Sequence, residues 1–591
     1  MTHHHIEKFL NELKKLSKAE SIPCIGGRSD LPTQPGLSVK DRHISLPVNK
    51  EDLDWLSKEG CESPFGKGMD TIIDTDVRRS IEFEAHNIEI SNPHWKPALD
   101  KLIDSIAHTM GIDFQVKAEL FKLLVYREGG HFKFHQDTEK SQGMFGTLIV
   151  QLPSRCDGGS LNCRFAGENY HFDFGNKEGD SEFSIYYAAH YADVHHQVEK
   201  IMDGSRLVLI YNLVQPEKER KLSANHHRKL LESSKDKLIP ITKALNEQQH
   251  SFLLQHEYTE QSLTDLGFRA TKGQDRDLLQ ALVAINENLP LENKLNFMIS
   301  RVSYSVTSDG SCGYYDRDDI DWEEIETSEP DCDFLFDESG HKIPVSNFMI
   351  DWVHDLNQKE ICSVSFDEVD DDFWGEGHDD IEGFMGNYGP TKETTYARYL
   401  LVIMPLYPDT SDAVSQDVAL QTHNALLMAK DLKHHSDCKW LKSRFDQALQ
   451  KSFVQFDSLV CQNDNSTHWD RWSDHKCDAI FTKLLETVIE MNDKDLCRKL
   501  LNMAKPFIIS NLSSYKHENI LRLLQNAIRH FGWENLSDSY QSILGALSGS
   551  VALKTSTALA ESLDSEAMRT TLIDMCTSII CSEESNTYIA I

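Results

Sequence analysis

Hydrophobic and polar positions change their spacing within the first 215 residues. From Ala98 to Met110, apolar residues recur every three or four positions, as on one face of a helix. After this helix, short apolar runs alternate with turn residues, which is typical of strands. Strands at roughly ten-residue spacing predict a sandwich or a squashed barrel. The predicted strands are Glu119–Tyr126, Gly146–Leu152, Ser160–Phe165, Tyr170–Phe174, Glu182–Ala188 and Arg206–Leu213.

Two segments have the composition of turns and loops. Asp157-Gly158-Gly159 predicts a hairpin turn, because glycine tolerates the positive φ that such turns require. The acidic segment Phe366–Glu382 is interrupted by glycine and aromatic residues, and a solvated loop is the structure that this composition favours.

The remainder of the chain predicts three further regions. An amphipathic stretch, Ile6–Lys18, lies near the start. Residues 216–410 are mixed, with a polar helical pattern at Glu217–Asn246 and a buried strand at Tyr396–Pro405. Residues 411–591 have a helical period almost throughout, and Gly532 is a plausible helix stop. The positions that show this period are Ile480, Phe481, Leu484, Leu485, Val488, Ile489, Leu521, Leu524, Ile528 and Phe531.

These patterns predict an α+β protein of several domains. We expect an N-terminal helix and linker in 1–35, a β-rich domain in 36–215 with its core at 119–215, a mixed α/β region in 216–410 that includes the acidic loop 366–382, and an all-α domain in 411–591. The last domain is a helical bundle or a solenoid, and it has no fixed repeat period that would decide between them.

Composition excludes some classes of protein. The 591 residues are 40% hydrophobic and 26% charged, as in ordinary globular proteins. The formal net charge of −34 repels phosphate backbones, so nucleic-acid binding is disfavoured. The 13 cysteines lack zinc-finger spacing and are expected to be reduced thiols. Without a signal peptide or a membrane-length apolar run, we expect a soluble cytoplasmic protein, with the nucleus left open.

Candidate chemistry comes from histidines and acids spaced as metal ligands. Two histidines and one carboxylate on one face hold non-haem iron, and His-x-Asp places two of the three ligands on one side of an extended segment. Composition alone predicts about two such triplets. The chain has five, which begin at His135, His171, His378, His435 and His468.

Context selects the first triplet. His135 and Asp137 follow a predicted strand and a glycine turn, and His196 follows about sixty residues later. Arg206 opens the next predicted strand, where it could form a bidentate pair with a distal carboxylate such as that of 2-oxoglutarate. His195 is the neighbour of His196, and adjacent residues on a strand cannot both face inward, so we expect His195 to point away.

The other four triplets fit poorly. The triplet at His171 lies only 25 residues before His196, too few for the strands predicted between them. His378 falls in the acidic loop, where a solvated histidine is expected. His435 and His468 fall in the helical region, where residues i and i+2 point to different faces.

At these residues the chain resembles the prolyl 4-hydroxylase-like group of Fe(II)/2-oxoglutarate oxygenases. The matching positions are Tyr126 and Gly129, Phe132, His135 and Asp137, His196 and Val198, and Arg206. The chain is more closely similar to a subgroup of large, mostly uncharacterised microbial and fungal members, at Ser63–Gly66, Asp74, Val77-Arg78, Tyr126–Lys140, Gly143–Leu148, Leu152–Ser154, Gly158-Gly159, Tyr191–Asp193, Tyr211–Leu213, Gly386–Gly389 and Tyr396–Tyr399. The resemblance covers roughly residues 40–215 strongly and 250–405 loosely. The chain departs from the group in two places, because collagen-type members have lysine where Arg206 stands and the subgroup has an acidic residue where His195 stands.

The resemblance implies a double-stranded β-helix, a jelly-roll-like fold. It implies that His135, Asp137 and His196 bind Fe(II), that Arg206 and Tyr126 bind 2-oxoglutarate, and that L-ascorbate keeps the iron reduced. The implied reaction hydroxylates a C–H bond and releases succinate and CO₂. A protein or peptide substrate, with prolyl residues as the leading candidate, rests on this analogy.

Two alternatives remain open from the sequence. The same iron centre could oxidise a small metabolite, which would need an enclosed pocket rather than an open groove. The chain could also be a scaffold or sensor with an inactive oxygenase domain, whose helical C-terminus binds a protein partner. An intact ligand set argues against loss of activity, and partner binding by residues 411–591 is compatible with catalysis.

Overall fold

The computed structural model describes 22–67, 70–137, 139, 141–216, 249–290, 293–313, 316–343, 350, 352–355, 362–369, 371–382, 390–406, 418–432, 442, 445–454, 456, 471–513, 518–560, 569–570, 573–574 and 577. The predicted segments Ile6–Lys18 and Glu217–Asn246 lie outside these residues. The chain divides into two compact units. The first comprises Met1–Leu289, Phe297–Lys342 and Ile350–Ile403, and the second Pro290–Asn296, Ile343–Met349 and Met404–Ile591.

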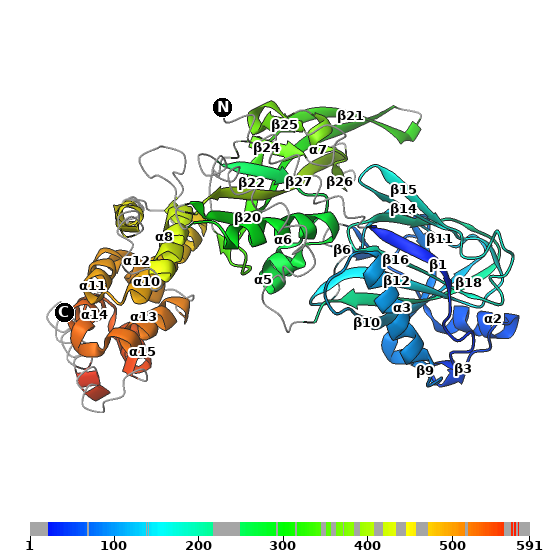
Figure 1. The fold of residues 1–591 in the computed structure, drawn as a ribbon, viewed down its shortest axis with the longest axis horizontal. Helices are drawn as coiled ribbons and strands as arrows, with labels where there is room; N and C mark the ends of the chain where they lie inside the picture. The colour runs from blue at the N-terminus through cyan, green and yellow to red at the C-terminus, as the bar shows by residue number, and fades with distance from the viewer. Residues whose placement is uncertain are drawn as a thin grey trace, which may run out of the picture. The chain divides into compact units, whose positions relative to one another are not determined.

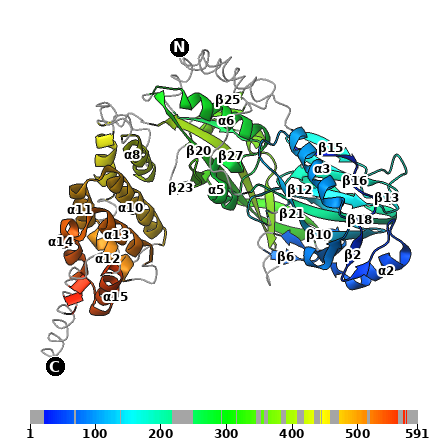
Figure 2. The ribbon, with the colours of Figure 1, turned by 60° about the horizontal axis from the view of Figure 1, so that its bottom comes forward.

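The first unit contains an eight-stranded antiparallel sheet (Figures 1 and 2). Its strand order is β1-β16-β12-β18-β10-β8-β4, with β13 paired to β18. The central strand β12 is buried along its whole length, as its place between β16 and β18 requires. The bounds are β1 Cys24–Ser29, β4 Cys61–Glu62, β8 Ile81–Glu84, β10 Lys117–Arg127, β12 Met144–Leu152, β13 Cys156–Gly158, β16 Ile185–Tyr191 and β18 Ile201–Val214.

A five-stranded antiparallel sheet has the order β15-β14-β17-β11-β7, and its residues share one hydrophobic core with the larger sheet. Its strands are β7 Arg78–Arg79, β11 His131–His135, β14 Leu161–Phe165, β15 Glu168–Phe172 and β17 His195–Val198. All six strands predicted before residue 215 are confirmed, with ends shifted by up to five residues, the largest shift being at β18, which begins at Ile201 and not at Arg206.

The helix predicted at Ala98–Met110 is confirmed as α3, Trp95–Thr109, which contacts β1 and β10 of the larger sheet. Its buried residues Leu99, Ile103 and Ile106 follow the predicted helical period and join the same core. Smaller elements complete this part, namely α2 Lys50–Glu59, η1 Ala85–Asn87, a sheet of β2 Leu37–Val39, β3 Arg42–His43 and β9 Ile88–Ile90, and a hairpin of β5 Phe65–Lys67 and β6 Asp70–Ile72.

The predicted hairpin at Asp157-Gly158-Gly159 is wrong. Strand β13 ends at Gly158 and pairs with β18 of the larger sheet, whereas β14 begins at Leu161 and pairs with β15 and β17 of the smaller sheet. The two glycines do adopt positive φ, +80° and +74°. A Cβ on Gly158 would lie 2.4 Å from the carbonyl oxygen of Lys200. The glycines therefore form a corner at which the chain passes from one sheet to the other.

The mixed region is built on a nine-stranded sheet of order β23-β22-β20-β27-β19-β24-β25, with β21 paired to β20 and β26 to β27. The predicted strand Tyr396–Pro405 is confirmed within β27. The elements are β19 His250–Leu253, α5 Glu260–Leu266, η2 Gly267–Ala270, α6 Gly273–Glu287, β20 Leu295–Gly313, β21 Asp316–Thr327, β22 Asp331–Phe336, β23 Lys342–Ile343, β24 Trp352–Asp355, β25 Cys362–Ser365, η4 Phe366–Glu368, α7 Asp371–Trp374, β26 His378–Glu382 and β27 Thr391–Pro405.

The prediction of a loop at Phe366–Glu382 is wrong. The segment contains η4, α7 and β26, and β26 pairs with β27 from His378 opposite Thr395 to Glu382 opposite Thr391. Trp374 is buried within it. The acidic side chains of Asp379 and Asp380 stay exposed, so pairing with a neighbouring strand has prevailed over a local composition that favours solvation.

The described residues of the second unit beyond β27 are almost entirely helical, as predicted. They form α8 Val418–Leu432, α10 Arg471–Met491, α11 Lys494–Met503, α12 Lys505–Leu512, α13 Glu518–Phe531, α14 Trp533–Leu544 and α15 Gly549–Ala560, with one apolar core between them. Gly532, at φ +81°, ends α13 and precedes α14. None of the described helices has the length and apolarity that crossing a membrane demands.

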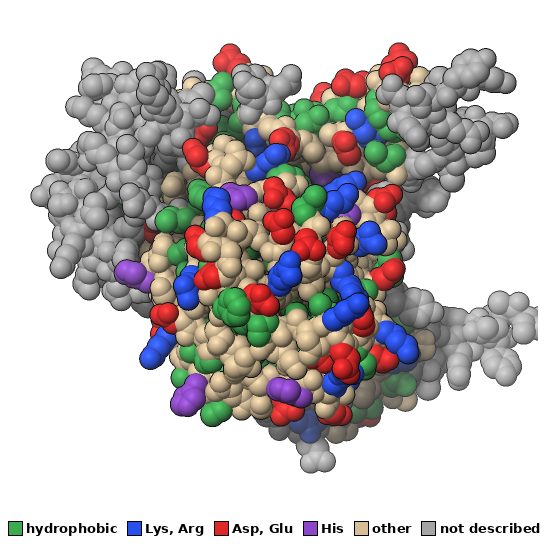
Figure 3. Space-filling view, turned by 90° about the vertical axis from the view of Figure 1, so that its right-hand side faces the viewer, with side chains coloured by type: hydrophobic (Ala, Val, Ile, Leu, Met, Phe, Trp, Pro, Cys, Tyr) green, Lys and Arg blue, Asp and Glu red, His purple; other side chains and the backbone are tan. Residues whose placement is uncertain are grey.

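Acidic and basic side chains are interspersed on the face of the first unit that Figure 3 shows. Exposed ion pairs such as Arg155 with Asp203, at 3.3 Å, have both side chains more than half exposed. Such pairs contribute at most about 1 kcal/mol to stability, because water and salt screen them. The charges that position the site are buried instead.

Candidate metal centre

Strand register brings the three predicted ligands together. Strands β11 and β17 are neighbours in the smaller sheet, and His135 lies opposite His196. Asp137 follows two residues after His135, where its backbone N–H donates to the carbonyl oxygen of Ala192 at 3.0 Å. One ligand atom from each of the three residues lies within 4.8 Å of the other two. As the alternation of a strand requires, His196 is buried and His195 is exposed.

Hydrogen bonds orient both imidazole rings. His135 Nδ1 lies 2.8 Å from the carbonyl oxygen of Lys133, and His196 Nδ1 lies 2.9 Å from that of Val194. A carbonyl oxygen can only accept, so each Nδ1 carries the proton and each Nε2 keeps a free lone pair. His196 Nε2 lies 3.9 Å from Asp137 Oδ1, while Asp137 Oδ2 accepts a 2.5 Å hydrogen bond from Thr147 Oγ1. The three ligand atoms therefore face one another, as a metal site requires.

The protonation states suit a metal. Burial lowers the pKa of His135 and that of His196 to about 4, so both rings are neutral at pH 7. Burial alone would raise the pKa of Asp137, but attraction to His196, His190 and His135 outweighs it and holds that pKa below its usual range. Two neutral imidazoles and one carboxylate form the donor set of a non-haem iron site.

Aromatic and cationic groups stack beside the ligands. The ring centroids of Phe132 and His135 lie 3.4 Å apart. The guanidinium of Arg78 lies 4.5 Å from the ring centroid of Phe132. On the opposite side, the ring of His190 on β16 lies 4.2 Å from that of His196. His190 is fully buried and its Nε2 has no hydrogen-bond partner among the described residues. These contacts fix the ligand rings from both sheets.

Arg206 is a buried cation that lacks a carboxylate partner among the described residues. It is 1% exposed, and its guanidinium lies 4.0 Å from the ring centroid of Phe174. Nε donates to Gln151 Oε1 at 2.8 Å and Nη1 to the carbonyl oxygen of Gly159 at 2.9 Å, whereas Nη2 has no partner. A buried guanidinium with an unused donor is suited to a ligand carboxylate. Tyr126 is its register partner across β10 and β18.

Side chains from both sheets line a cavity of about 340 Å³ that contains the three ligands. Tyr126 lines it, whereas Arg206 lies next to Tyr126 without lining the cavity. Glu84, the last residue of β8, also lines the cavity and its side chain is largely exposed, so the cavity reaches solvent near the end of this strand. Further lining residues are Phe65, Arg78, Glu82, Lys122, Leu124, Phe132, Thr147, Ile149, Ile210 and Asn212.

The rejected triplets lie elsewhere or outside the described residues. His171 is exposed, with Nδ1 2.6 Å from Asn162 Oδ1, and Asp173 accepts from the backbone N–H groups of a turn. His378 is exposed on β26. His435 and His468 lie outside the described residues. In the part of the chain that the structure describes, His135, Asp137 and His196 are the only three such side chains close enough to share an ion.

Sequence reasoning assigned no role to Thr147, Gln151 or His190. Thr147 and Gln151 lie on a strand that the sequence did predict, and alternation places them, with Ile149, on the face toward the cavity. The signal was therefore present, but only the positions of the ligands make it meaningful. His190 becomes part of the site because it pairs in register with Thr147.

Comparison with solved structures finds likenesses of low similarity, among them the following three. A prolyl-4-hydroxylase from Pseudomonas putida aligns over 35% of this chain and 99% of its own, with 13% identity and a TM-score of 0.24. A 2OG-Fe(II) oxygenase family oxidoreductase from Burkholderia pseudomallei aligns over 35% and 90%, with 15% identity and a TM-score of 0.20. A Trichoplax adhaerens prolyl hydroxylase, in complex with a peptide fragment of hypoxia inducible factor, aligns over 36% and 94%, with 11% identity and a TM-score of 0.23. No protein-family model and no curated protein sequence matches the chain.

Proposed function

We propose that this protein is an Fe(II)- and 2-oxoglutarate-dependent dioxygenase whose two facing sheets form a double-stranded β-helix. His135, Asp137 and His196 would hold the iron, and Arg206 with Tyr126 would bind 2-oxoglutarate. The observation that carries the proposal is the pairing of two features in one domain. His135, Asp137 and His196 face a shared point. The buried Arg206 has no carboxylate partner among the described residues, and its Nη2 donor is unpaired there.

The protein's own residues supply position and exclusion of water. The Nδ1 hydrogen bonds of His135 and His196 hold both Nε2 atoms toward Asp137. Thr147 holds one carboxylate oxygen and leaves the other toward the ligands. Leu124, Ile149 and Ile210 form an apolar wall that keeps water from the reacting atoms. When bound, the iron and 2-oxoglutarate supply the oxidising chemistry, which yields succinate, CO₂ and a hydroxylated substrate.

The proposed substrate is a C–H bond of a protein or peptide residue, with prolyl residues as the leading candidate. The cavity opens near the end of β8, where Glu84 is largely exposed. An open rim lets one side chain of a larger molecule reach the iron while the rest stays outside. The peptide bound to the Trichoplax adhaerens enzyme is the reason to test peptides first.

The test measures succinate formation and 2-oxoglutarate binding by the full chain with Fe(II), ascorbate and O₂. Wild-type protein should bind 2-oxoglutarate only with metal and turn it over slowly without a substrate. His196→Ala should abolish both, and Arg206→Ala should recover turnover only at high 2-oxoglutarate. His195→Ala is the matched control, because that neighbouring side chain is exposed, and it should behave as wild type. Metal-independent binding, or equal turnover in His196→Ala, would overturn the proposal.

A further inference from the structure

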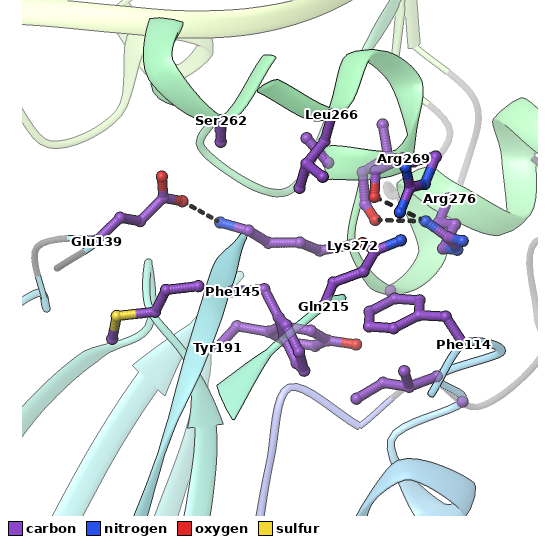
Figure 4. Close-up of a pocket in the computed structure, with 16 residues that line it drawn as sticks. Phe114, Glu139, Phe145, Tyr191, Gln215, Ser262, Leu266, Arg269, Lys272 and Arg276 are labelled. Carbon is purple, nitrogen blue, oxygen red and sulfur yellow. Dashed lines mark hydrogen bonds and ion pairs between the residues drawn. The ribbon is translucent and has the colours of Figure 1, made fainter. Parts of the chain in front are cut away.

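A cluster of charged side chains around the buried residues Asp193, His256 and Lys272 connects the core to the residues after 249. We call this cluster the joint, and it consists of Glu139, Asp193, His256, Glu257 and Lys272. Glu139 and Asp193 belong to the two segments that carry the metal ligands, while His256, Glu257 and Lys272 come from the chain around α5, η2 and α6. Figure 4 shows Lys272 extending from the helical side toward Glu139, above Tyr191 and Phe145 of the core.

Both carboxylate oxygens of Asp193 are paired with other groups of the joint. This residue lies three residues before His196 and is buried. Its Oδ2 accepts from the backbone N–H of Glu257 at 3.0 Å and lies 2.8 Å from His256 Nδ1, and its Oδ1 accepts from Lys272 Nζ at 3.3 Å. Burial alone would raise the pKa of Asp193, but Lys272 and His256 outweigh it and keep the carboxylate charged. A buried, charged and fully paired side chain has little freedom to move.

Lys272 contacts both ligand-bearing segments. Its Nζ lies 3.3 Å from Asp193 Oδ1 and 3.8 Å from Glu139 Oε1. Glu139 comes two residues after Asp137 in the sequence. Lys272 Nζ also donates to the carbonyl oxygen of Glu257 at 3.0 Å. The side chain is 4% exposed, so solvent screens these interactions weakly. One ammonium group therefore connects the segment of Asp137 to the segment of His196.

Hydrogen bonds from uncharged donors reinforce the same connection. Gln136, between the ligands His135 and Asp137, donates through Nε2 to the carbonyl oxygen of Asp193 at 2.9 Å and to Glu257 Oε1 at 3.1 Å. Thr259 Oγ1 donates to Glu139 Oε2 at 2.6 Å. The two segments also bond directly through the N–H of Asp137 and the carbonyl oxygen of Ala192. The separation between Asp137 and His196 is thus set partly from outside the two sheets.

The segment that supplies His256 and Glu257 is itself anchored. Asp275 on α6 accepts from the backbone N–H groups of Gln255 and His256 and from the hydroxyl of Tyr258, at 2.8 to 3.0 Å. Asp275 and Tyr258 are buried. Hydrogen bonds of Asp275 therefore connect the 255–258 segment to the start of α6, next to Lys272.

We infer that Lys272 and Asp193 are positioning residues of the metal centre, because they connect the two segments that carry its ligands. The inference rests on the proposed function, because it requires that His135, Asp137 and His196 bind a metal. The joint fixes the distance between the Asp137 and His196 segments before the ion arrives, which reduces the reorganisation that binding requires. Groups that orient metal ligands from behind typically contribute ten- to a hundredfold, by order of magnitude, to affinity.

The test is Co(II) titration of the full chain, followed by the visible absorption of the bound ion and without any turnover. Lys272→Met should weaken Co(II) binding by roughly tenfold or more and change the absorption spectrum, because the ligand separation changes. Arg276→Met is the matched control. Arg276 is a buried cation on α6 of similar exposure, but it pairs with Asp113, which lies outside both ligand segments. It should bind Co(II) within about twofold of wild type, although the fold loses stability.

Asp193→Asn gives a second variant that removes the charge and keeps the shape of the side chain. It should weaken Co(II) binding as Lys272→Met does, and thermal melts identify any variant that has not folded. Equal Co(II) affinity and equal spectra in wild type, Lys272→Met and Asp193→Asn would overturn the inference while leaving the proposed function intact. Equal weakening in Arg276→Met would also overturn it. If wild type and His196→Ala bind Co(II) alike, the proposed function fails and the inference falls with it.

Discussion

Helix α6 beside the joint and strand β18 beside the cavity each carry a buried arginine, and the two arginines have opposite surroundings. In the joint region, Arg276 Nε donates to Asp113 Oδ1 at 2.6 Å and Nη1 to the carbonyl oxygen of Arg269 at 2.9 Å. Beside the cavity, Arg206 has an amide and a carbonyl as partners, and no carboxylate among the described residues pairs with it. Both side chains are at least 90% buried.

The difference separates structure from function. A buried charge is costly unless it is paired, so Arg276 with Asp113 forms a self-sufficient pair that holds α6 to the core. Arg206 carries the same cost without an anionic partner among the described residues, where its Nη2 donor is also unpaired. The polypeptide tolerates such a group where a ligand supplies the anion. We therefore expect mutation of the two arginines to change different quantities, stability for Arg276 and ligand affinity for Arg206.

The largest effect is expected for Arg276→Met. The variant leaves Asp113 partly buried with Gln280 as its remaining partner, and breaking a buried pair in this way costs about 3–5 kcal/mol. Urea denaturation should show this loss as a lower unfolding free energy in the transition of the first unit. The double variant Arg276→Met/Asp113→Asn should recover part of it, because no charge is then left unpaired. A loss below about 1 kcal/mol would contradict the pairing argument.

Arg206→Met should produce the largest loss of 2-oxoglutarate binding. Loss of a desolvated charge partner costs about 2–5 kcal/mol, at least thirtyfold in affinity. Excess 2-oxoglutarate with metal should raise the melting temperature of wild-type protein and leave that of the variant unchanged, because only a bound ligand stabilises the fold. Without ligand, the variant should lose less stability than Arg276→Met. Unchanged affinity in the variant would assign Arg206 to the core instead.

The sequence predicted the cavity better than it predicted the joint, for a physical reason. Strand alternation is local, so the spacing of His135 and Asp137 and the strand at Arg206 could be found from short segments. Lys272 and Asp193 are 79 residues apart, and Arg276 and Asp113 are 163 apart. Such pairs arise only when α6 packs against the core, and no local period announces them. Sequence spacing thus found the three candidate ligands but not the buried charges around them.

Secondary structure followed the same rule. Long strands such as β12 and β18 were predicted because their buried positions repeat along the chain. The short strands β7, β11 and β17 were not predicted, because two to five residues carry too little pattern. Strand β26 was predicted as loop, since its acidic composition outweighed the pairing with β27 that only the tertiary structure supplies.

The pH dependence of metal binding gives a smaller and distinctive effect. Metal binding needs neutral histidines, and burial lowers the pKa of both His135 and His196 to about 4. The folded protein therefore excludes these protons, and Co(II) affinity should stay nearly constant from pH 7 to about 5.5 and fall as the pH approaches 4. Two histidines with ordinary pKa values near 6.5 would instead lose about a hundredfold by pH 5.5. Titrations at stepped pH distinguish the two outcomes.

In the metal-free protein, the same shifts act on stability with a defined sign. Below pH 6.5 the unfolded chain binds protons at these histidines and the folded chain does not, so unfolding free energy falls as the pH falls from about 6.5 to 4. Saturating Co(II) should enlarge this slope, because the ion binds only the deprotonated folded site. An unfolding free energy that rises as the pH falls from 6.5 to 4 would contradict the lowered pKa values of His135 and His196.

The smallest effect is expected for the triplet that sequence context rejected. His171 is exposed, and its ring forms one hydrogen bond to the described residues, between Nδ1 and Asn162 Oδ1. His171→Ala should therefore leave Co(II) affinity unchanged and alter unfolding free energy by about 0.5 kcal/mol or less, as surface substitutions usually do. His135→Ala, which removes the same residue from the same His-x-Asp pattern, should abolish Co(II) binding. If the two variants lost Co(II) affinity equally, the His-x-Asp pattern alone would determine the site, and its place between the sheets would not matter. The contrast between the paired Arg276 and the unpaired Arg206 would then say nothing about function.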